Sequence, residues 1–418
     1  MHDCNGKAYT LTYLRQRRYF YYLSGCNLPD SYLVYDIESA HLTLFIPPVD
    51  ADDVIWSGMP TTPSEALSKY DIDACKTSDE INPFLLSKDR SHRIIYAINP
   101  QISDHITFFP FREVDIHTLK PAIETCRVTK DAHEIALIRH ANAISSYAHQ
   151  NVMRIARDAR NEAELMGTFV GTCIANGGRE QAYGCICAAG PNAATLHYIH
   201  NDLPLEEKLN LLIDAGCEYS CYCSDITRTY PLSGRFTKES REVYDIVDRM
   251  QSVCMGMLRE GVRWEDVHER AHQVAIEGLL HLGILKGSKE DVFASRVSTV
   301  FFPHGLGHYL GMDTHDCGGN PDYEDKDPMF RYLRIRGTIP ENAVLTNEPG
   351  LYFCRFIIEP ALKDEKMSKF IDEKVLERYW TVGGVRLEDD IWIKKDGYEN
   401  LTTAPRSWEE IEKLIMGS

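Results

Sequence analysis

The chain changes character around Lys120 and Pro121, and this change constrains its fold more than any other feature. Before this point, short aromatic and β-branched runs alternate with turn residues, which is typical of short strands. After it, long runs with apolar residues at helical spacing alternate with strand-like runs. We therefore expect an α+β protein of two domains, a small α/β domain over residues 1–122 and a larger domain over residues 123–418.

The smaller domain is expected to contain several short strands and one short helix. The strand-like runs cover residues 19–23, 32–35, 41–46 and 93–97, and the helix covers residues 64–69. The run over residues 41–46 ends at Pro47 and Pro48, where a strand must stop.

The larger domain should contain several long helices. Thr129 and Asp131 can cap a helix that runs from His133 towards Ile155, because apolar residues recur along one face of that run. Asn161 followed by Glu164 resembles a capping box before a second helix. Two more amphipathic helices are predicted over residues 238–258 and 264–281. The predicted strands cover residues 209–213, 344–347, 351–353, 384–387 and 390–393.

The composition excludes some partners. The chain has 45 basic and 62 acidic residues, so its net charge of −17 argues against binding to nucleic acid or to an anionic membrane. No run of eighteen apolar residues could span a membrane, and the first residues lack the apolar segment of a signal peptide. We expect a cytoplasmic location.

The 13 cysteines include a dense group at Cys217, Cys221 and Cys223, with Cys185 and Cys187 nearby in sequence. The spacing of this group is not that of a known zinc finger. We interpret these residues as buried free thiols in a reducing compartment.

Five segments of the larger domain carry chemistry, and each presents an acid or a histidine. The residues are Asp214 after an apolar strand, Asp225 eleven residues later, His304 and His308 around two glycines, Glu348 before a turn, and Glu388 on a short strand. Taken singly, each is typical of a turn, cap or surface residue. Together, four carboxylates and a histidine suit manganese, cobalt or zinc, and four carboxylates can neutralise two divalent cations.

These segments, in this order, resemble those of the creatinase-like, or pita-bread, metallopeptidases, and within them the Xaa-Pro aminopeptidase and prolidase branch. Similarity to the fungal Xaa-Pro aminopeptidases extends through residues 15–18, 22–25, 45–48 and 53–58, and the resemblance covers almost the whole chain. It implies a pita-bread fold, in which helices cover a six-stranded antiparallel sheet, preceded by a small domain like the N-terminal domain of aminopeptidase P. It also implies hydrolysis of the bond between an N-terminal residue and a penultimate proline.

The resemblance also implies two Mn²⁺ ions per subunit, with Co²⁺ or Zn²⁺ also suitable. It assigns metal binding to Asp214, Asp225, His308, Glu348 and Glu388. Asp225 and Glu388 would bridge both ions, and Glu348 would also shuttle a proton. The substrate-side histidines, which would hold the carbonyl and stabilise the oxyanion, are His197, His304 and His315. Arg386 would support the carboxylates and the proton path.

Alternatives remain open at this stage. Arg334 matches the position where prolidases bind a dipeptide carboxylate, so an Xaa-Pro dipeptidase competes with an aminopeptidase. Lower alternatives are a metal-free binding scaffold and a creatinase-like amidinohydrolase, for which the full ligand set is not expected. The resemblance also implies that the chain is shortened before residue 22 and leaves a homodimer open.

Overall fold

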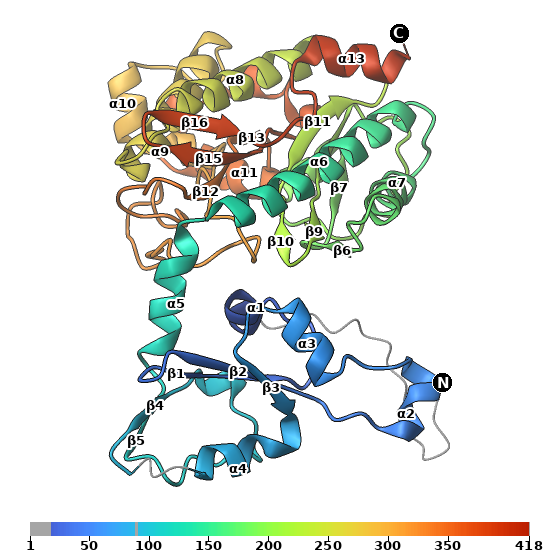
Figure 1. Cartoon of the computed structure of the whole chain (residues 1–418). Coiled ribbons are helices and arrows are strands. Elements are labelled where there is room, and N and C mark those ends of the chain that lie inside the picture. The colour runs from blue at the N-terminus through green and yellow to red at the C-terminus, as the bar shows by residue number, and fades with distance from the viewer. Residues whose placement is uncertain (1–17, 88–90, 418) are drawn as a thin grey trace. The chain divides into compact units, whose positions relative to one another are not determined.

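The computed structural model describes residues 18–87 and 91–417, and the chain divides into two compact units, Met1–Glu124 and Thr125–Ser418. The first unit contains short strands and short helices, and the second contains long helices around antiparallel strands (Figure 1). The prediction of a shortened start concerns residues that lie outside the described part.

A three-stranded sheet in the order β1-β2-β3 forms the centre of the smaller unit. β1 pairs antiparallel with β2, and β3 pairs parallel with β2. Successive side chains of the central strand point to opposite faces, so Leu44 and Ile46 pack with Ala66 of α3 while Phe45 packs with Ile81 and Leu85 of α4. The elements of this unit are α1 (Arg18–Ser24), β1 (Tyr32–Asp36), β2 (His41–Ile46), α2 (Ala51–Ser57), α3 (Pro63–Lys69), β3 (Ala74–Thr77), η1 (Ser78–Glu80), α4 (Ile81–Leu86), β4 (Ile94–Tyr96), η2 (Asn99–Gln101) and β5 (Glu113–Asp115).

The run over residues 19–23 is helix α1, so the predicted strand is wrong there. Aromatic residues favour strands only weakly, and packing overrides that preference. Phe20 packs against the core under β2, and the hydroxyl of Ser24 donates to its carbonyl over 2.7 Å. The helix ends at Gly25, whose left-handed φ of +63° lets its N–H donate to the carbonyl of Tyr21. This glycine is the sequence signal of a helix end.

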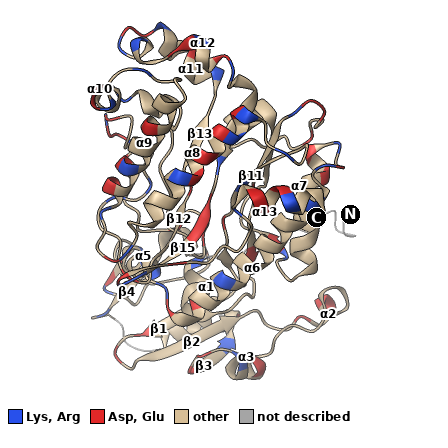
Figure 2. Ribbon diagram, turned by 90° about the horizontal axis from the view of Figure 1, so that it is seen from above, with Lys and Arg blue, Asp and Glu red and all other residues tan. Residues whose placement is uncertain are grey.

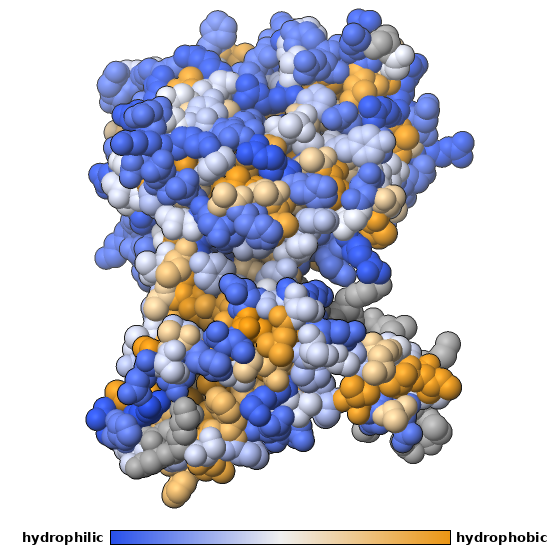
Figure 3. Space-filling view, viewed as in Figure 1, coloured by the Kyte–Doolittle hydropathy of each residue, from blue (hydrophilic) through white to orange (hydrophobic). Residues whose placement is uncertain are grey.

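Helix α2 is stabilised by its cap, since none of its residues is buried. The side chain of Asp50 accepts a hydrogen bond from the N–H of Asp52 over 2.9 Å. Ile55 and Trp56 are 82% and 75% exposed, and they contribute to an apolar surface at this helix (Figure 3).

The long helices of the larger unit begin where the sequence predicts. Asp131 accepts hydrogen bonds from the first turn of α6, and Glu134 completes a capping box by accepting from the N–H of Asp131. Asn161 caps α7 by accepting from the N–H of Ala163. α6 packs on α7, and α8 packs on α9. The helices are α5 (Leu119–Val128), α6 (Ala132–Ile155), α7 (Glu162–Ala175), η3 (Gly190–Ala194), α8 (Lys238–Met255), α9 (Trp264–His281), α10 (Lys289–Ala294), η4 (Val297–Val300), α11 (Arg355–Lys363), η5 (Ser368–Phe370), α12 (Glu373–Leu376), η6 (Trp380–Val382) and α13 (Trp408–Met416).

The strands of this unit pair antiparallel in several short sheets. Their orders are β11-β8-β7, β12-β15-β16, β10-β9-β6 and β13-β14. An isolated bridge pairs Thr227 of β11 with Glu388, the residue directly before β15. The antiparallel strands thus form several short sheets, whereas the family resemblance predicts one sheet of six strands. The strands are β6 (Glu180–Gln181), β7 (Ile186–Ala189), β8 (Asn210–Asp214), β9 (Cys217–Tyr219), β10 (Tyr222–Cys223), β11 (Thr227–Pro231), β12 (Val344–Asn347), β13 (Gly350–Tyr352), β14 (Gly384–Arg386), β15 (Asp389–Lys394) and β16 (Gly397–Asn400).

One large hydrophobic core joins the inner faces of these helices to the strands. Acidic residues nevertheless occur inside it, since β15 begins with Asp389 and Asp390, which are both buried (Figure 2). Buried acids need hydrogen bonds or cations, so the buried acids at the start of β15 indicate a functional site in this region. The buried cysteines of this unit include Cys185, Cys187, Cys217, Cys221 and Cys223, and none of these five is in a disulfide.

None of the helices in the described ranges is both long enough and apolar enough to cross a membrane.

Candidate active site

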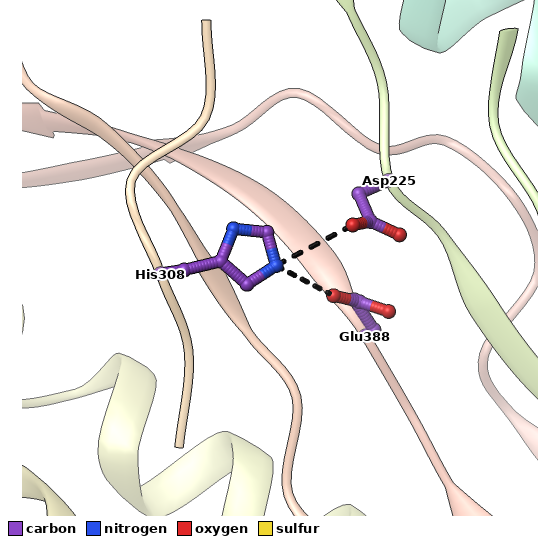
Figure 4. A group of neighbouring side chains, drawn as sticks. All are labelled: Asp225, His308 and Glu388. Carbon is purple, nitrogen blue, oxygen red and sulfur yellow. Dashed lines mark ion pairs between the residues drawn. The ribbon is translucent and has the colours of Figure 1, made fainter. Parts of the chain in front are cut away.

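Three predicted metal ligands, Asp225, His308 and Glu388, lie together in the interior of the larger unit (Figure 4). One potential ligand atom from each lies within 4.8 Å of the others. The Nε2 atom of His308 is 3.4 Å from Oδ2 of Asp225 and 4.0 Å from Oε1 of Glu388. One imidazole nitrogen among carboxylate oxygens is a ligand set that suits manganese, cobalt or zinc.

The other two predicted ligands adjoin this group. Oε1 of Glu348, between β12 and β13, is 3.6 Å from Nε2 of His308. Asp214 ends β8, and the hydroxyl of Tyr183 donates to its Oδ1 over 2.6 Å and also to Asp225. The structure therefore brings together all five residues to which the sequence assigns a metal.

Strand pairing explains this convergence. Thr227 of β11 lies opposite Asp214 of β8 and also bridges to Glu388. Asp225, Thr227 and Thr229 alternate along the chain, so they face the same side. The hydroxyl of Thr227 donates to Oε2 of Glu388 over 2.6 Å and fixes that carboxylate.

The tautomer of His308 directs a lone pair at the carboxylates. Its Nδ1 is 3.0 Å from the carbonyl oxygen of Tyr309, which can only accept, so Nδ1 carries the proton. Burial, the largest cause, lowers the pKa of His308, which favours the neutral ring. Nε2 then presents a lone pair to the carboxylate oxygens of Asp225 and Glu348. Such an arrangement suits a cation bound between them.

The carboxylates of this group are buried close together, and their negative charges repel one another. Burial, and then the charge of Asp214, raises the pKa of Asp225 well above its usual range. Burial and the neighbouring Asp225 do the same for Glu388. Burial raises the pKa of Glu348 to about 7. Bound divalent cations would balance this charge, so the residues present fit a metal centre.

Glycines let the histidine loop approach its neighbours closely. A Cβ atom on Gly307 would lie 2.0 Å from the carbonyl oxygen of Thr346, and one on Gly305 would lie 2.7 Å from that of Tyr332. The N–H of His308 donates to the hydroxyl of Thr346 over 3.1 Å. The spacing of two histidines around two glycines therefore has a packing cause.

His304 belongs to a chain of hydrogen bonds. Its Nδ1 lies 2.8 Å from the carbonyl of Gly305 and therefore donates, so Nε2 accepts from the hydroxyl of Tyr352 over 2.8 Å. The Tyr352 oxygen accepts from Arg386 over 3.0 Å, and Arg386 pairs with Asp214 over 2.5 Å. Burial, and then the charge of Arg386, lowers the pKa of His304 to about 3. A neutral His304 is thus linked to the acids, without occupying a position between them.

The remaining predicted residues, His197, His315 and Arg334, lie beside one another, with His315 against His308. The ring of His315 packs edge-on against His308, with centroids 4.4 Å apart. Desolvation lowers the pKa of His315, followed by the charges of His308, Arg334 and His197, which places all three nearby. His197 is exposed, and Arg334 is half-buried. Within the described residues, the Arg334 side chain has no hydrogen-bond or ion-pair partner, so its charge is available to a ligand.

Comparison with known proteins gives the family. Residues 136–395 match metallopeptidase family M24, and residues 7–96 match the N-terminal domain of aminopeptidase P. The chain belongs to metallopeptidase family M24. It is 60% identical over 405 residues to a probable Xaa-Pro aminopeptidase of Pyrenophora tritici-repentis, covering 97% of this chain and 88% of the relative. A probable Xaa-Pro aminopeptidase of Talaromyces stipitatus is 57% identical, with the same two coverages.

Solved structures agree with this assignment. Zinc-substituted aminopeptidase P of Escherichia coli in complex with product has a TM-score of 0.82 and 30% identity, covering 97% of this chain and 90% of that one. Proline aminopeptidase P II of Yersinia pestis has a TM-score of 0.81 and 33% identity, covering 97% and 91%. The pita-bread fold and the small N-terminal domain are therefore confirmed, and the chain is a metal-dependent peptidase.

The sequence analysis did not single out several residues around the centre of this M24 member. Thr227 could have been found, because it lies two residues after Asp225 on the same face of a strand. Tyr352 follows Glu348 by four residues, but its link to His304 depends on tertiary structure. Tyr183 lies in no pattern that would indicate a site, and only the fold brings it to Asp214.

Proposed function

We propose that this M24 peptidase is an Xaa-Pro aminopeptidase that uses two Mn²⁺ ions. The observation that carries the proposal is the convergence of four carboxylates and one imidazole from five separate segments on one buried place. The names of the similar fungal and bacterial proteins support the same activity.

The five convergent residues would hold the metals, with Asp225 and Glu388 in the shared positions. The bound ions would supply Lewis acidity and lower the pKa of the attacking water. Glu348 would accept a proton from the attacking water and pass it towards the leaving nitrogen. Its carboxylate lies 3.6 Å from Nε2 of His308 and 3.9 Å from Nδ1 of His304, beside both groups. Arg386 orients the carboxylate of Asp214 through their ion pair.

The substrate side of the site consists of His197, His304 and His315. In this proposal they orient the scissile carbonyl and stabilise the charge that develops on its oxygen. A bond before proline has a nitrogen without N–H and a fixed φ, so its recognition depends on shape and on contacts to the carbonyl. The cytoplasmic location and the homodimer stay predictions.

A second candidate is an Xaa-Pro dipeptidase, and Arg334 favours it. Burial is the main cause that lowers the pKa values of His304 and His315, and the charge of the half-buried Arg334 guanidinium adds to it. This guanidinium has no hydrogen-bond or ion-pair partner among the described residues. If it binds a dipeptide carboxylate, Arg334→Ala removes a charge-assisted pair worth about 1.5–3 kcal/mol. The Michaelis constant for Gly-Pro should then rise about 10- to 150-fold, while a longer peptide loses much less.

The test measures turnover of Gly-Pro and of a Gly-Pro-Xaa tripeptide with Mn²⁺ present, on the wild type, Arg334→Ala and the exposed control Arg331→Ala. If the wild type prefers the tripeptide, and Arg334→Ala loses activity equally on both substrates, the protein is an aminopeptidase. Preference for Gly-Pro with a selective loss in Arg334→Ala establishes the dipeptidase. Elemental analysis of the purified protein decides the scaffold alternative, because a scaffold would contain no stoichiometric metal.

A further inference from the structure

Glu162, the first residue of α7, is completely buried and has no ion-pair partner in the described part of the chain. Burying a carboxylate without a cation is costly unless hydrogen bonds satisfy it. The position at a helix N-terminus helps, because the helix dipole favours negative charge there. The Glu162 carboxylate therefore needs several hydrogen-bond donors, and the segment that supplies these donors indicates the role of the residue.

All four donors come from the segment that begins at Ala189, the last residue of β7, and ends at Leu203. Oε1 of Glu162 accepts from the N–H of Ala189 over 2.9 Å and from the amide of Asn192 over 3.3 Å. Oε2 accepts from the hydroxyl of Tyr198 over 2.8 Å and from the N–H of Leu203 over 3.1 Å. One carboxylate thus accepts hydrogen bonds from four residues of the segment 189–203. We name this segment the substrate loop.

The substrate loop carries His197, whose own side chain is exposed. Its neighbour Tyr198 is only 5% exposed and packs in a small cluster with Leu212 and Tyr352. At the far end of the loop, Asn201 accepts from the N–H of Cys187 and donates to the carbonyl of Cys185, each over 2.7 Å. The backbone at His197 is therefore fixed through Tyr198.

We propose that Glu162 is a positioning residue that holds His197 in the substrate site, acting through the hydroxyl of Tyr198. The inference rests on the proposed function, in which His197 orients the scissile carbonyl. Glu162 itself touches no substrate in this scheme. Loss of the hydrogen bond between Tyr198 and Glu162 lets the imidazole of His197 shift. A displacement of about 1 Å can lower the rate of the reaction up to about 100-fold.

The test is a double-mutant cycle. Tyr198→Phe keeps the ring and removes the hydroxyl that donates to Glu162 and accepts from the amide of Asn192 over 3.3 Å. His197→Ala removes the group that is positioned. We expect Tyr198→Phe to lower kcat/KM about 10- to 100-fold with unchanged metal content. In the His197→Ala background the same substitution should cost less than about twofold, because coupled residues are not additive.

Tyr379→Phe is the matched control. Tyr379 is also buried, and its hydroxyl donates to Glu242 over 2.7 Å, but it lies outside the substrate loop. Tyr379→Phe should leave kcat/KM within about twofold of the wild type, because the tyrosine–glutamate hydrogen bond that it removes does not hold the substrate loop. A multiplicative loss from Tyr198→Phe in both backgrounds, or equal losses in Tyr198→Phe and Tyr379→Phe, would overturn the positioning role.

Amide hydrogen exchange keeps the inference separate from the proposed function. Tyr198→Phe and Glu162→Gln should speed exchange within residues 189–203 and leave the protected amides of α8 unchanged. If the wild type hydrolyses no Xaa-Pro peptide with Mn²⁺, the proposed function fails, while hydrogen exchange still shows whether Glu162 and Tyr198 hold the substrate loop. Unchanged exchange in the substrate loop of both variants would refute the positioning role of Glu162.

Discussion

Asp316 follows His315 directly, and we expect its buried ion pairs with Arg127 and Lys130 to stabilise the loop that carries His315. Its Oδ1 lies 2.6 Å from a terminal nitrogen of Arg127, and its Oδ2 lies 3.0 Å from Nζ of Lys130. All three side chains are at most 2% exposed. Gly311 leaves no spare room, because a Cβ there would lie 2.3 Å from Oδ2 of Asp316. Asp316→Asn keeps the shape and removes the charge.

The expected loss is large because both cations stay buried. Arg127 retains Asp313, whose side chain is 43% exposed, while Lys130 retains the carbonyl of Val128 over 3.2 Å. Removing one partner of a buried ion pair costs about 3–5 kcal/mol, and among the described residues Asp316 is the carboxylate that pairs with Lys130. At about 2 °C for each kcal/mol in a large domain, the melting temperature should fall by about 6–10 °C.

Differential scanning calorimetry of the metal-loaded protein measures this shift. Asp245→Asn is the control, since Asp245 pairs with Arg241 on α8 over 2.7 Å and is 54% exposed. An exposed pair contributes about 0–1 kcal/mol, so the control should lose at most about 2 °C. A loss in Asp316→Asn no larger than that of the control would refute the claim that this network stabilises the fold.

The same variant has a defined pH dependence. Burial alone would raise the pKa of Asp316, but Lys130 and Arg127 together lower it below its ordinary value. A lowered carboxylate pKa contributes stability in full above the unfolded value of about 3.9, and that contribution disappears as the pH falls through the folded value. The difference in melting temperature between wild type and Asp316→Asn should therefore be constant from about pH 5.5 to 8 and shrink below about pH 4. A difference that changes between pH 6 and 8 would contradict this assignment.

Two further predictions concern the centre itself. Asp225→Asn should abolish peptidase activity and lower metal content, because the amide removes a negative ligand oxygen; a variant that keeps most of its manganese and rate would contradict the ligand assignment. His304→Ala should keep its metals but lose about 100- to 1,000-fold in turnover, as expected when one preorganised stabilising group is removed. Metal loss in that variant would mean that His304 and His308 have exchanged roles.

The elements that the sequence predicted well are those with strong local signals. α6 combines helical periodicity with a capping box, α9 spans the predicted residues Trp264–His281, and β12 spans the predicted residues Val344–Asn347. The failure at residues 19–23 occurred where the local preference was weak and the packing of Phe20 decided the outcome. The predicted boundary between residues 122 and 123 lies inside α5 (Leu119–Val128), a continuous helix whose residues show no break there.

The anchors behind the site could not be predicted, and the reason is physical. Glu162 and Asp316 look locally like a helix-start acid and a loop acid, which are usually solvated. Their partners lie 27–41 and 186–189 residues away, and only folding brings those donors to them. Once burial is known, the need to satisfy each carboxylate requires such partners. The ligands of the centre carry a family pattern in sequence, whereas the placement of His197 and His315 depends on long-range contacts of acids with no such pattern.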